Sequence, residues 1–256
     1  AFSRSSPSTS SVVGGFRTGS YGDMGTRPYM EDFLLSRDLR LKGRNASRRP
    51  RACLFAVFDG HSGEEAANYL QKNLAVTLES ALNAVSEEVF LLTGEALDTL
   101  MKSTIAESFA DLDEKLCATP SGVSGSCASS LVIMDSRLYC SNLGDSRVVL
   151  CRGGKAVVLS GDAHKPTNLD EADRIQKSGG FLLKGRVLGG LAVTRSFGDW
   201  QYKNQADLRR MAGLSEGDAI SPLIIATPNI NVELLKKIDD YVVLACDGLW
   251  DVLGNQ

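Results

Sequence analysis

Two short apolar segments each run directly into an Asp-Gly pair. Residues 52–58 (ACLFAVF) lead into Asp59-Gly60, and residues 241–246 (YVVLAC) lead into Asp247-Gly248. Their length and composition favour strands that are buried on both faces. A carboxylate held at the end of a buried strand is costly unless a cation meets it. Asp-Gly is also the commonest hairpin turn, so one such pair is weak evidence, but two of them suggest that Asp59 and Asp247 meet a cation.

The expected cation is one that prefers oxygen ligands. The chain has two histidines, His61 and His164, and none of its six cysteines forms a C-x-x-C pair, so we do not expect a zinc cage. Several carboxylates with few His or Cys residues are the ligand set of Mg²⁺ or Mn²⁺. Each acid alone is more often a surface or turn residue than a ligand. The further candidates are Glu31, Asp32, Asp145, Asp199 and Asp251.

Composition narrows the class of protein. The 256 residues are 43% hydrophobic and 23% charged, as in a soluble protein with a substantial core. The net charge of -3 does not suggest a nucleic-acid partner. No apolar run approaches the roughly 20 residues of a membrane span, and no signal-peptide pattern opens the chain. We expect a protein of the cytoplasm or nucleus, with its cysteines as small buried residues in a reducing compartment.

The order of patterns along the chain predicts its secondary structure. The Ser-rich residues 1–14 are expected to form a flexible arm before a domain over residues 15–256. A capping box at Ser62–Glu65 predicts a helix through about Leu82, and apolar spacing predicts a second helix over about residues 95–116. A cap at Thr167 predicts a third, short helix that ends near Ser178. Short strands are expected at 127–134, 137–143, 146–151 and 155–159.

Two remaining segments are polar. The basic residues 37–51 are expected to form an exposed loop, and residues 201–221 an irregular stretch. Because strands and helices come in separate blocks without regular βαβ alternation, the pattern favours an α+β fold with antiparallel sheets.

Six motifs occur in order along nearly the whole chain. They are R-P-Y-M-E-D (27–32), F-D-G-H-S-G (58–63), G-D-S-R (144–147), H-K-P (164–166), L-A-V-T-R-S-F-G-D (191–199) and A-C-D-G-L-W-D (245–251). This set resembles the type 2C serine/threonine protein phosphatases. The resemblance implies two antiparallel β-sheets packed as a central sandwich, flanked by α-helices, with a binuclear metal site at one end.

The resemblance also implies roles for individual residues. Asp59 would bridge two metal ions, the Gly60 carbonyl would bind one ion and Asp247 the other, and Glu31 would act mainly through metal-bound waters. Asp145 and Asp251, with Asp247, match positions that form a weaker third metal site in some relatives. Arg27 would hold the substrate phosphate and His61 would be the general acid. The segment around 163–190 resembles a variable flap beside the active site that helps to choose substrates.

The end of the chain departs from the family pattern. The family normally closes with an Asp-Asn pair whose Asp is another metal ligand, whereas this sequence ends at Gly254-Asn255-Gln256. Either the sequence is part of a longer chain or the site is incomplete. We expect the former, because the match continues to the last residues, and so expect a catalytic domain that lacks its C-terminal end.

These observations predict a hydrolase that acts on phosphorylated proteins. No cysteine lies in a phosphate-cradling loop, so we expect direct attack by a water that two Mg²⁺ or Mn²⁺ ions activate. Arg27 would pair bidentately with the phosphate, and His61 would protonate the departing serine or threonine alkoxide. We expect a monomer with no nucleic acid and no membrane span. The alternatives are a pseudophosphatase that kept the fold as a binding module, and a metal-dependent phosphodiesterase or nuclease, which the acidic balance disfavours.

Overall fold

A large antiparallel sheet forms around the segment that follows residue 51. The computed structural model describes residues 5–42, 51–85, 92–119, 123–215 and 218–256. Strand β4 lies between β3 and β5 and is buried at most positions, as expected from its unbroken apolar run. The described sheet has the order β12-β6-β5-β4-β3, and β11 pairs with the first residues of β5. Its strands are β3 (Asp32–Asp38), β4 (Ala52–His61), β5 (Gly125–Met134), β6 (Arg137–Leu143), β11 (Phe197–Gly198) and β12 (Asn229–Leu234).

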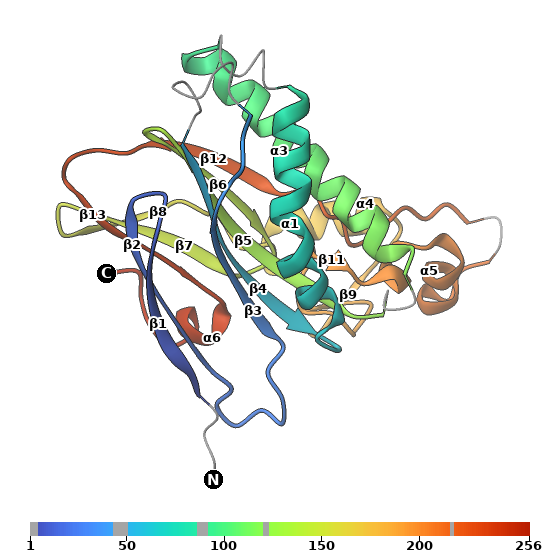
Figure 1. Ribbon diagram of the computed structural model, residues 1–256. Helices are drawn as coiled ribbons and strands as arrows, with labels where there is room; N and C mark the ends of the chain where they lie inside the picture. Colours follow the sequence, from blue (N-terminus) through green and yellow to red (C-terminus); the bar gives the residue numbers. More distant parts are fainter. Residues whose placement is uncertain (1–4, 43–50, 86–91, 120–122, 216–217) are drawn as a thin grey trace.

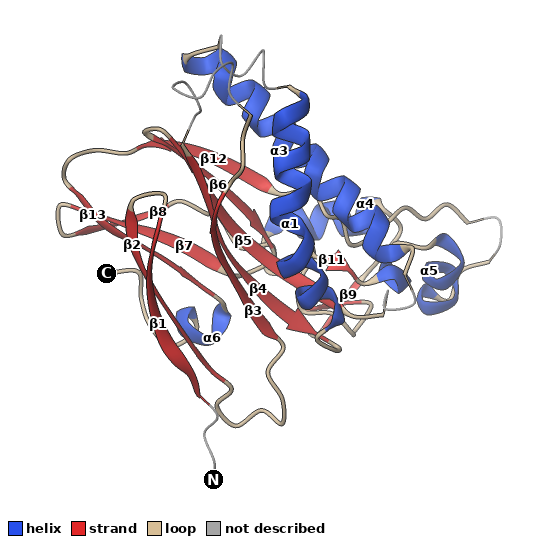
Figure 2. Cartoon of the chain, in the orientation of Figure 1, coloured by secondary structure: helices blue, strands red, loops and turns tan. Residues whose placement is uncertain are grey.

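A second, smaller sheet packs against one face of the large sheet (Figures 1 and 2). It has the order β13-β7-β8, from β13 (Asp239–Ala245), β7 (Arg147–Arg152) and β8 (Lys155–Val158). The two sheets share an apolar cluster that includes Leu131 and Ile133 of β5 and Leu150 of β7. The expectation that β13 is buried on both faces was wrong. Val242 and Leu244 pack against the cluster between the sheets, whereas Tyr241, on the opposite face of the strand, is 62% exposed.

Two long helices cover the other face of the large sheet. They are α1 (Glu65–Ala84) and α3 (Gly94–Cys117), as the apolar stripes predicted. Leu70, Leu74 and Phe109 are fully buried between the helices and the sheet. Each such side chain contributes roughly 1.5–3 kcal/mol by leaving water. The α+β sandwich with flanking helices is therefore confirmed.

The start of α1 differs from the predicted capping box. The N-cap residue is Glu64, and its side chain makes no capping hydrogen bond, while Ser62 has a left-handed backbone with φ of 59°. The Gly63 N–H donates instead to Glu31 Oε1 at 2.7 Å, and the Ala66 N–H donates to Ser124 Oγ at 3.1 Å. The amide of Gly63, just before the helix, and that of Ala66, in its first turn, are therefore satisfied by residues distant in sequence.

The N-terminal segment is a strand where we expected a flexible arm. β1 (Ser5–Val13) pairs with β2 (Phe16–Asp23) in an antiparallel hairpin, which corrects the prediction for those residues. Gly14 and Gly15 form the turn with positive φ values, which glycine adopts without strain. Val13 is buried in the cluster between the two sheets, and this contact anchors the end of the strand. The domain boundary at residue 15 stays a prediction.

A smaller layer extends from one end of the sandwich and has its own apolar cluster. Ile175, Val187, Leu208 and Leu223 lie in this cluster. Asn168 caps α4, where we expected Thr167, and α5 lies in the stretch that we predicted to be irregular. The layer comprises α4 (Leu169–Lys177), β9 (Leu182–Leu183), β10 (Arg186–Val187), the 3₁₀ turn η1 (Trp200–Tyr202) and α5 (Gln205–Ala212).

The remaining sequence predictions concern short strands, a loop and the membrane. β5 to β8 begin and end within two residues of the predicted strands. In the segment 37–51 that we expected to be an exposed loop, Arg37 and Asp38 belong to β3, and Leu39 and Leu41 are buried, which corrects the prediction there. Residues 43–50 of this segment lie outside the described residues. Among the helices that the structure describes, none combines the length and the apolar character that crossing a membrane requires.

Candidate metal centre

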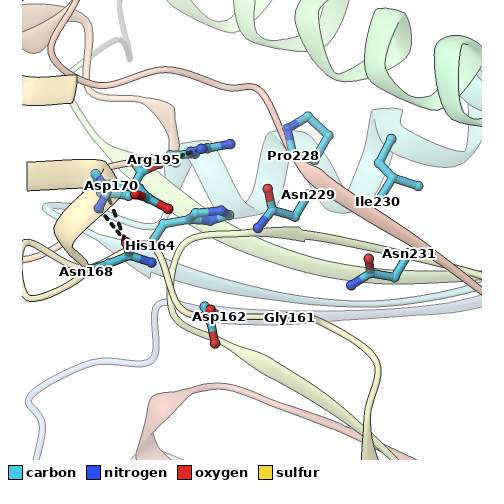
Figure 3. Close-up of a pocket in the computed structure, with 11 residues that line it drawn as sticks. Gly161, Asp162, His164, Asn168, Asp170, Arg195, Pro228, Asn229, Ile230 and Asn231 are labelled. Atoms are coloured by element: carbon cyan, nitrogen blue, oxygen red, sulfur yellow. Dashed lines mark hydrogen bonds and ion pairs between the residues drawn. The ribbon is translucent and has the colours of Figure 1, made fainter. Parts of the chain in front are cut away.

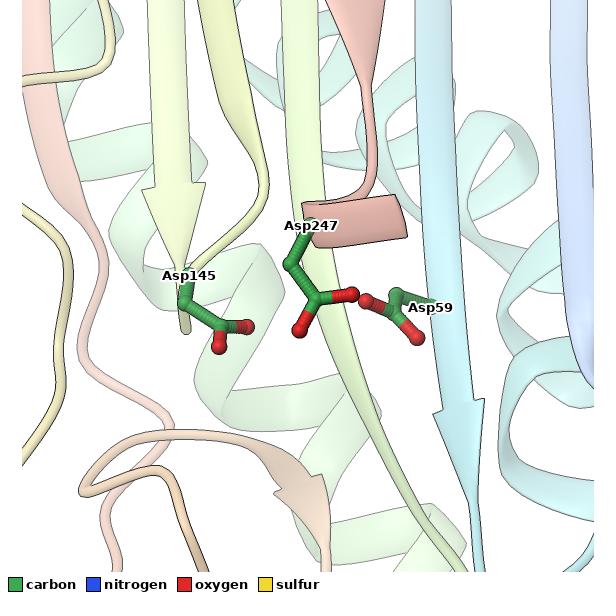
Figure 4. A group of neighbouring side chains, drawn as sticks. All are labelled: Asp59, Asp145 and Asp247. Carbon is green, nitrogen blue, oxygen red and sulfur yellow. The ribbon is translucent and has the colours of Figure 1, made fainter. Parts of the chain in front are cut away.

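Three carboxylates meet where the two sheets end (Figure 4). Asp59 lies near the end of β4, Asp145 lies in the turn between β6 and β7, and Asp247 begins the short helix α6 (Asp247–Trp250) after β13. One oxygen of each carboxylate lies within 4.8 Å of an oxygen of the other two. The predicted convergence of Asp59 and Asp247 is confirmed. Asp145, one of the further candidate acids in the sequence, joins them.

The electrostatics of this cluster favour a bound cation. Burial, followed by the charges of Asp32, Asp247 and Asp145, raises the pKa of Asp59 to about 8. Burial and then the charges of Asp145 and Asp251 also raise the pKa of Asp247. Carboxyl groups in this position either hold protons or bind positive charge. An all-oxygen donor set that repels itself suits a hard divalent ion, so the residues present fit such an ion.

Two neighbouring acids lie at the start of β3: Asp32 is its first residue, and Glu31 directly precedes it. The register of β3 and β4 places Asp32 opposite Asp59, and Asp32 accepts a hydrogen bond from Cys246 Sγ at 3.2 Å. Burial is the main cause that raises the pKa of Asp32. Glu31 holds the start of α1 through the Gly63 N–H. The sequence had offered Asp32 as a candidate without a role, and the strand pairing supplies its position.

Gly60 lies where no larger residue fits. A Cβ atom at this position would lie 2.5 Å from the backbone carbonyl oxygen of Glu31. The close approach of β3 and β4 beside Asp59 therefore requires glycine here. Whether the Gly60 carbonyl binds a metal ion stays a prediction.

His61 has a buried partner that sequence reasoning did not assign. Its Nε2 lies 2.7 Å from Oδ2 of Asp199, which is 1% exposed and also accepts a hydrogen bond from the Ser196 hydroxyl. Burial alone would lower the pKa of His61, but the hydrogen bond and the charge of Asp199 raise it above its ordinary value. A Cβ atom on Gly125 would lie 2.2 Å from Asp199 and 2.3 Å from His61, so this pair also depends on a glycine.

Arg27 and Asp251 lie at the margins of the cluster. Arg27 is exposed, and its charge opposes the rise in the pKa of Asp32. The Asp251 side chain is 65% exposed. Lys165 lies between Asp145 and Asp251, at 3.1 Å from the first and 3.8 Å from the second. Lys165 therefore links Asp251 to Asp145 of the cluster.

A polar pocket adjoins the segment that leads into α4 (Figure 3). The buried His164 faces it, and burial followed by the charge of Arg195 lowers the pKa of His164 to about 4. Nδ1 of this neutral ring accepts a hydrogen bond from the Gly144 N–H at 3.1 Å, so His164 supports the turn that carries Asp145. The lining residues are Gly161, Asp162, His164, Asn168, Asp170, Glu171, Arg195, Pro228, Asn229, Ile230 and Asn231.

Comparisons with known proteins agree on one family. The family model described as protein phosphatase 2C matches residues 22–256. The chain is 34% identical to probable protein phosphatase 2C 59 of Oryza sativa subsp. japonica, over 96% of this chain and 65% of that protein. It is 36% identical to probable protein phosphatase 2C 13 of Arabidopsis thaliana, over 97% of this chain and 62% of that protein. The chain thus spans less than two thirds of either relative.

Two solved structures resemble the chain as well. One is a sex determining protein of C. elegans, with a TM-score of 0.66 and 25% identity over 90% of this chain and 51% of that one. The other is serine-threonine phosphatase 2C from Toxoplasma gondii, with a TM-score of 0.69 and 23% identity over 91% of this chain and 78% of that one. The second likeness supports the fold alone.

Proposed function

The chain belongs to the protein phosphatase 2C family, and we propose from this that it hydrolyses phosphoserine and phosphothreonine in proteins with the help of bound metal ions. The observation that carries the proposal is the cluster of Asp59, Asp145 and Asp247, whose carboxylate oxygens lie within 4.8 Å of one another. Substrate choice depends on residues outside the metal-binding cluster, so the proposal names the reaction and not a particular phosphoprotein.

The proposed cofactor is Mg²⁺ or Mn²⁺, with two ions and a weaker third. Asp59, Asp145 and Asp247 would hold the ions. The Gly60 carbonyl, Glu31 and Asp251 are the further ligands that the family resemblance implies. Ions of this kind, when bound, activate water for attack on phosphorus and offset charge on the phosphoryl oxygens.

His61 is the proposed general acid. Because Nε2 bonds to Asp199, the other ring nitrogen, Nδ1, would donate a proton to the departing serine or threonine oxygen. Asp199 raises the pKa of His61, and this keeps more of the imidazole in its protonated form near neutral pH. In this proposal Asp199 is a positioning residue that acts through His61.

Arg27 is the proposed phosphate-binding residue. A guanidinium group can donate two parallel hydrogen bonds to a phosphate, which a lysine cannot do equally well. Its exposure and its electrostatic effect on Asp32 support a place at the open edge of the carboxylate cluster.

A phosphatase assay tests the proposal. Release of phosphate from a phosphothreonine peptide would be measured with Mn²⁺ for the wild type, for Asp59→Asn and for Asp135→Asn. Asp135 is an exposed turn residue at the other end of β5, with a φ of 54° that asparagine tolerates, so it is the matched control. We expect turnover that Asp59→Asn removes and Asp135→Asn keeps. Normal Mn²⁺ binding without any turnover by the wild type would instead indicate a pseudophosphatase.

A further inference from the structure

One end of the carboxylate cluster is already in contact with a cation of the protein itself. Lys165 Nζ lies 3.1 Å from Oδ2 of Asp145 and 3.8 Å from Oδ1 of Asp251. The Asp145 side chain is only 6% exposed, whereas the lysine is 33% exposed and can reach solvent. Asp145 therefore has two possible partners, the ammonium group of Lys165 and any metal ion that the cluster binds.

The backbone around Lys165 is fastened to the turn that carries Asp145. The His164 N–H donates to the Gly144 carbonyl at 2.9 Å, and the Gly144 N–H donates back to Nδ1 of His164 at 3.1 Å. The Lys165 carbonyl accepts a hydrogen bond from the N–H of Asn168, the residue that caps α4. Lys165 thus joins the carboxylate cluster to the first residues of the small layer that contains α4.

We propose that Lys165 is a built-in counter-ion that competes with a divalent ion for Asp145. The inference rests on the proposed function only in treating the cluster as a metal site. An ammonium group and a metal ion repel each other and seek the same oxygens, so a metal ion at Asp145 must displace the lysine toward Asp251 or solvent. The Asp145 end of the cluster therefore binds metal more weakly than the end formed by Asp59 and Asp247. Metal at Asp145 would also break the ion pair between Lys165 and Asp145, while the hydrogen bonds between His164 and Gly144 remain.

Titration calorimetry of Mn²⁺ into the metal-free protein tests this competition. The variants are Lys165→Met, which removes the charge, Lys165→Arg, which keeps it, and Lys177→Met as the control. Lys177 is 76% exposed and pairs with Asp173 on α4. Because a positive charge about 3 Å from Asp145 is removed, we expect the weakest Mn²⁺ step to tighten at least about tenfold in Lys165→Met. Lys165→Arg and Lys177→Met should titrate like the wild type.

Two results would overturn the proposal. Unchanged or weaker Mn²⁺ binding by Lys165→Met would mean that the lysine holds Asp145 in place without competing with metal. An equal gain in Mn²⁺ affinity in Lys177→Met would mean that the effect comes from the net charge of the protein and not from the contact with Asp145. Thermal unfolding of each variant checks the fold, and Lys165→Gln replaces the methionine variant should that one fail to fold. Because the readout is metal binding, it is independent of turnover: absent phosphatase activity would refute the proposed function while leaving this result intact.

Discussion

Replacing Asp59 with Asn should make the metal-free protein less sensitive to pH while it weakens metal binding. In the folded protein, burial and the charges of Asp32, Asp247 and Asp145 raise the pKa of Asp59 to about 8. In the unfolded chain the pKa is about 3.9. Between these two values the folded state holds a proton that the unfolded state has lost. The free energy of unfolding of the wild type therefore falls as the pH rises.

The size of the effect follows from proton linkage. One extra proton in the folded state changes the free energy of unfolding by about 1.4 kcal/mol per pH unit. Between pH 5.5 and 7.5 the wild type should lose about 3 kcal/mol, and Asp59→Asn should be free of this loss. The same proton must leave before a metal ion takes its place. Wild-type Mn²⁺ affinity should therefore rise by up to about tenfold per pH unit below pH 8.

Urea unfolding in EDTA at three pH values and Mn²⁺ titration calorimetry measure the two effects. Asp135→Asn is the control and should follow the wild type in both. If the unfolding free energies of wild type and Asp59→Asn run parallel between pH 5.5 and 7.5, the crowding of carboxylates around Asp59 has been misjudged. Equal Mn²⁺ affinities would show that Asp59 is a turn residue and not a ligand.

Three further outcomes can be checked with the same protein. Phosphatase activity should depend on added Mg²⁺ or Mn²⁺ and disappear in EDTA, because oxygen ligands hold these ions only moderately; full turnover after exhaustive chelation would contradict the mechanism. His61→Gln should lower kcat for a phosphothreonine peptide by roughly 10²–10⁴-fold, and kcat for p-nitrophenyl phosphate much less, because p-nitrophenolate leaves without a proton. Equal losses for both substrates would mean that His61 only holds its loop in place. Glu171→Gln should lower the free energy of unfolding, measured by urea titration, by about 3–5 kcal/mol, because Arg174 and Arg195 lose their nearly buried carboxylate partner. A decrease below about 1 kcal/mol would mean that these ion pairs are as weak as surface pairs.

Local sequence patterns predicted those helices and strands whose apolar side chains recur at the spacing of a buried face. β4 and the two long helices were expected because apolar periodicity and burial agree there. The hairpin of β1 and β2 was missed because β1 is polar, although its Gly14-Gly15 pair is itself a hairpin signal. The capping box at Ser62 failed for a different reason. Ser62 has a left-handed backbone, and the next amide, the Gly63 N–H, donates to Glu31, which is distant in sequence.

Some residues of the site could be predicted from local sequence, whereas others depend on pairing between distant segments. Asp59 and Asp247 could be proposed from the sequence because each directly follows an apolar strand. Asp199 could be noticed as an acid but not as the partner of His61, because the two are 138 residues apart and meet through the pairing of β4 and of β11 with β5. The role of Asp32 depends on the register of β3 against β4. Positions fixed by pairing between distant segments are those that a single sequence leaves open.

The cluster takes one carboxylate from each of three places in the sandwich. Asp59 belongs to the large sheet, Asp247 follows the edge strand of the small sheet, and Asp145 lies in the turn that crosses from β6 in one sheet to β7 in the other. The distances among the three carboxylates are therefore set by the apolar cluster between the sheets, which contains Leu131 of β5 and Leu150 of β7. Close packing resists small shifts, so it holds like charges nearer together than they would settle alone. A cation bound there would offset this repulsion and link the two sheets. Metal binding should therefore stabilise the packing of the sheets, and tighter packing should in turn raise the affinity for the metal.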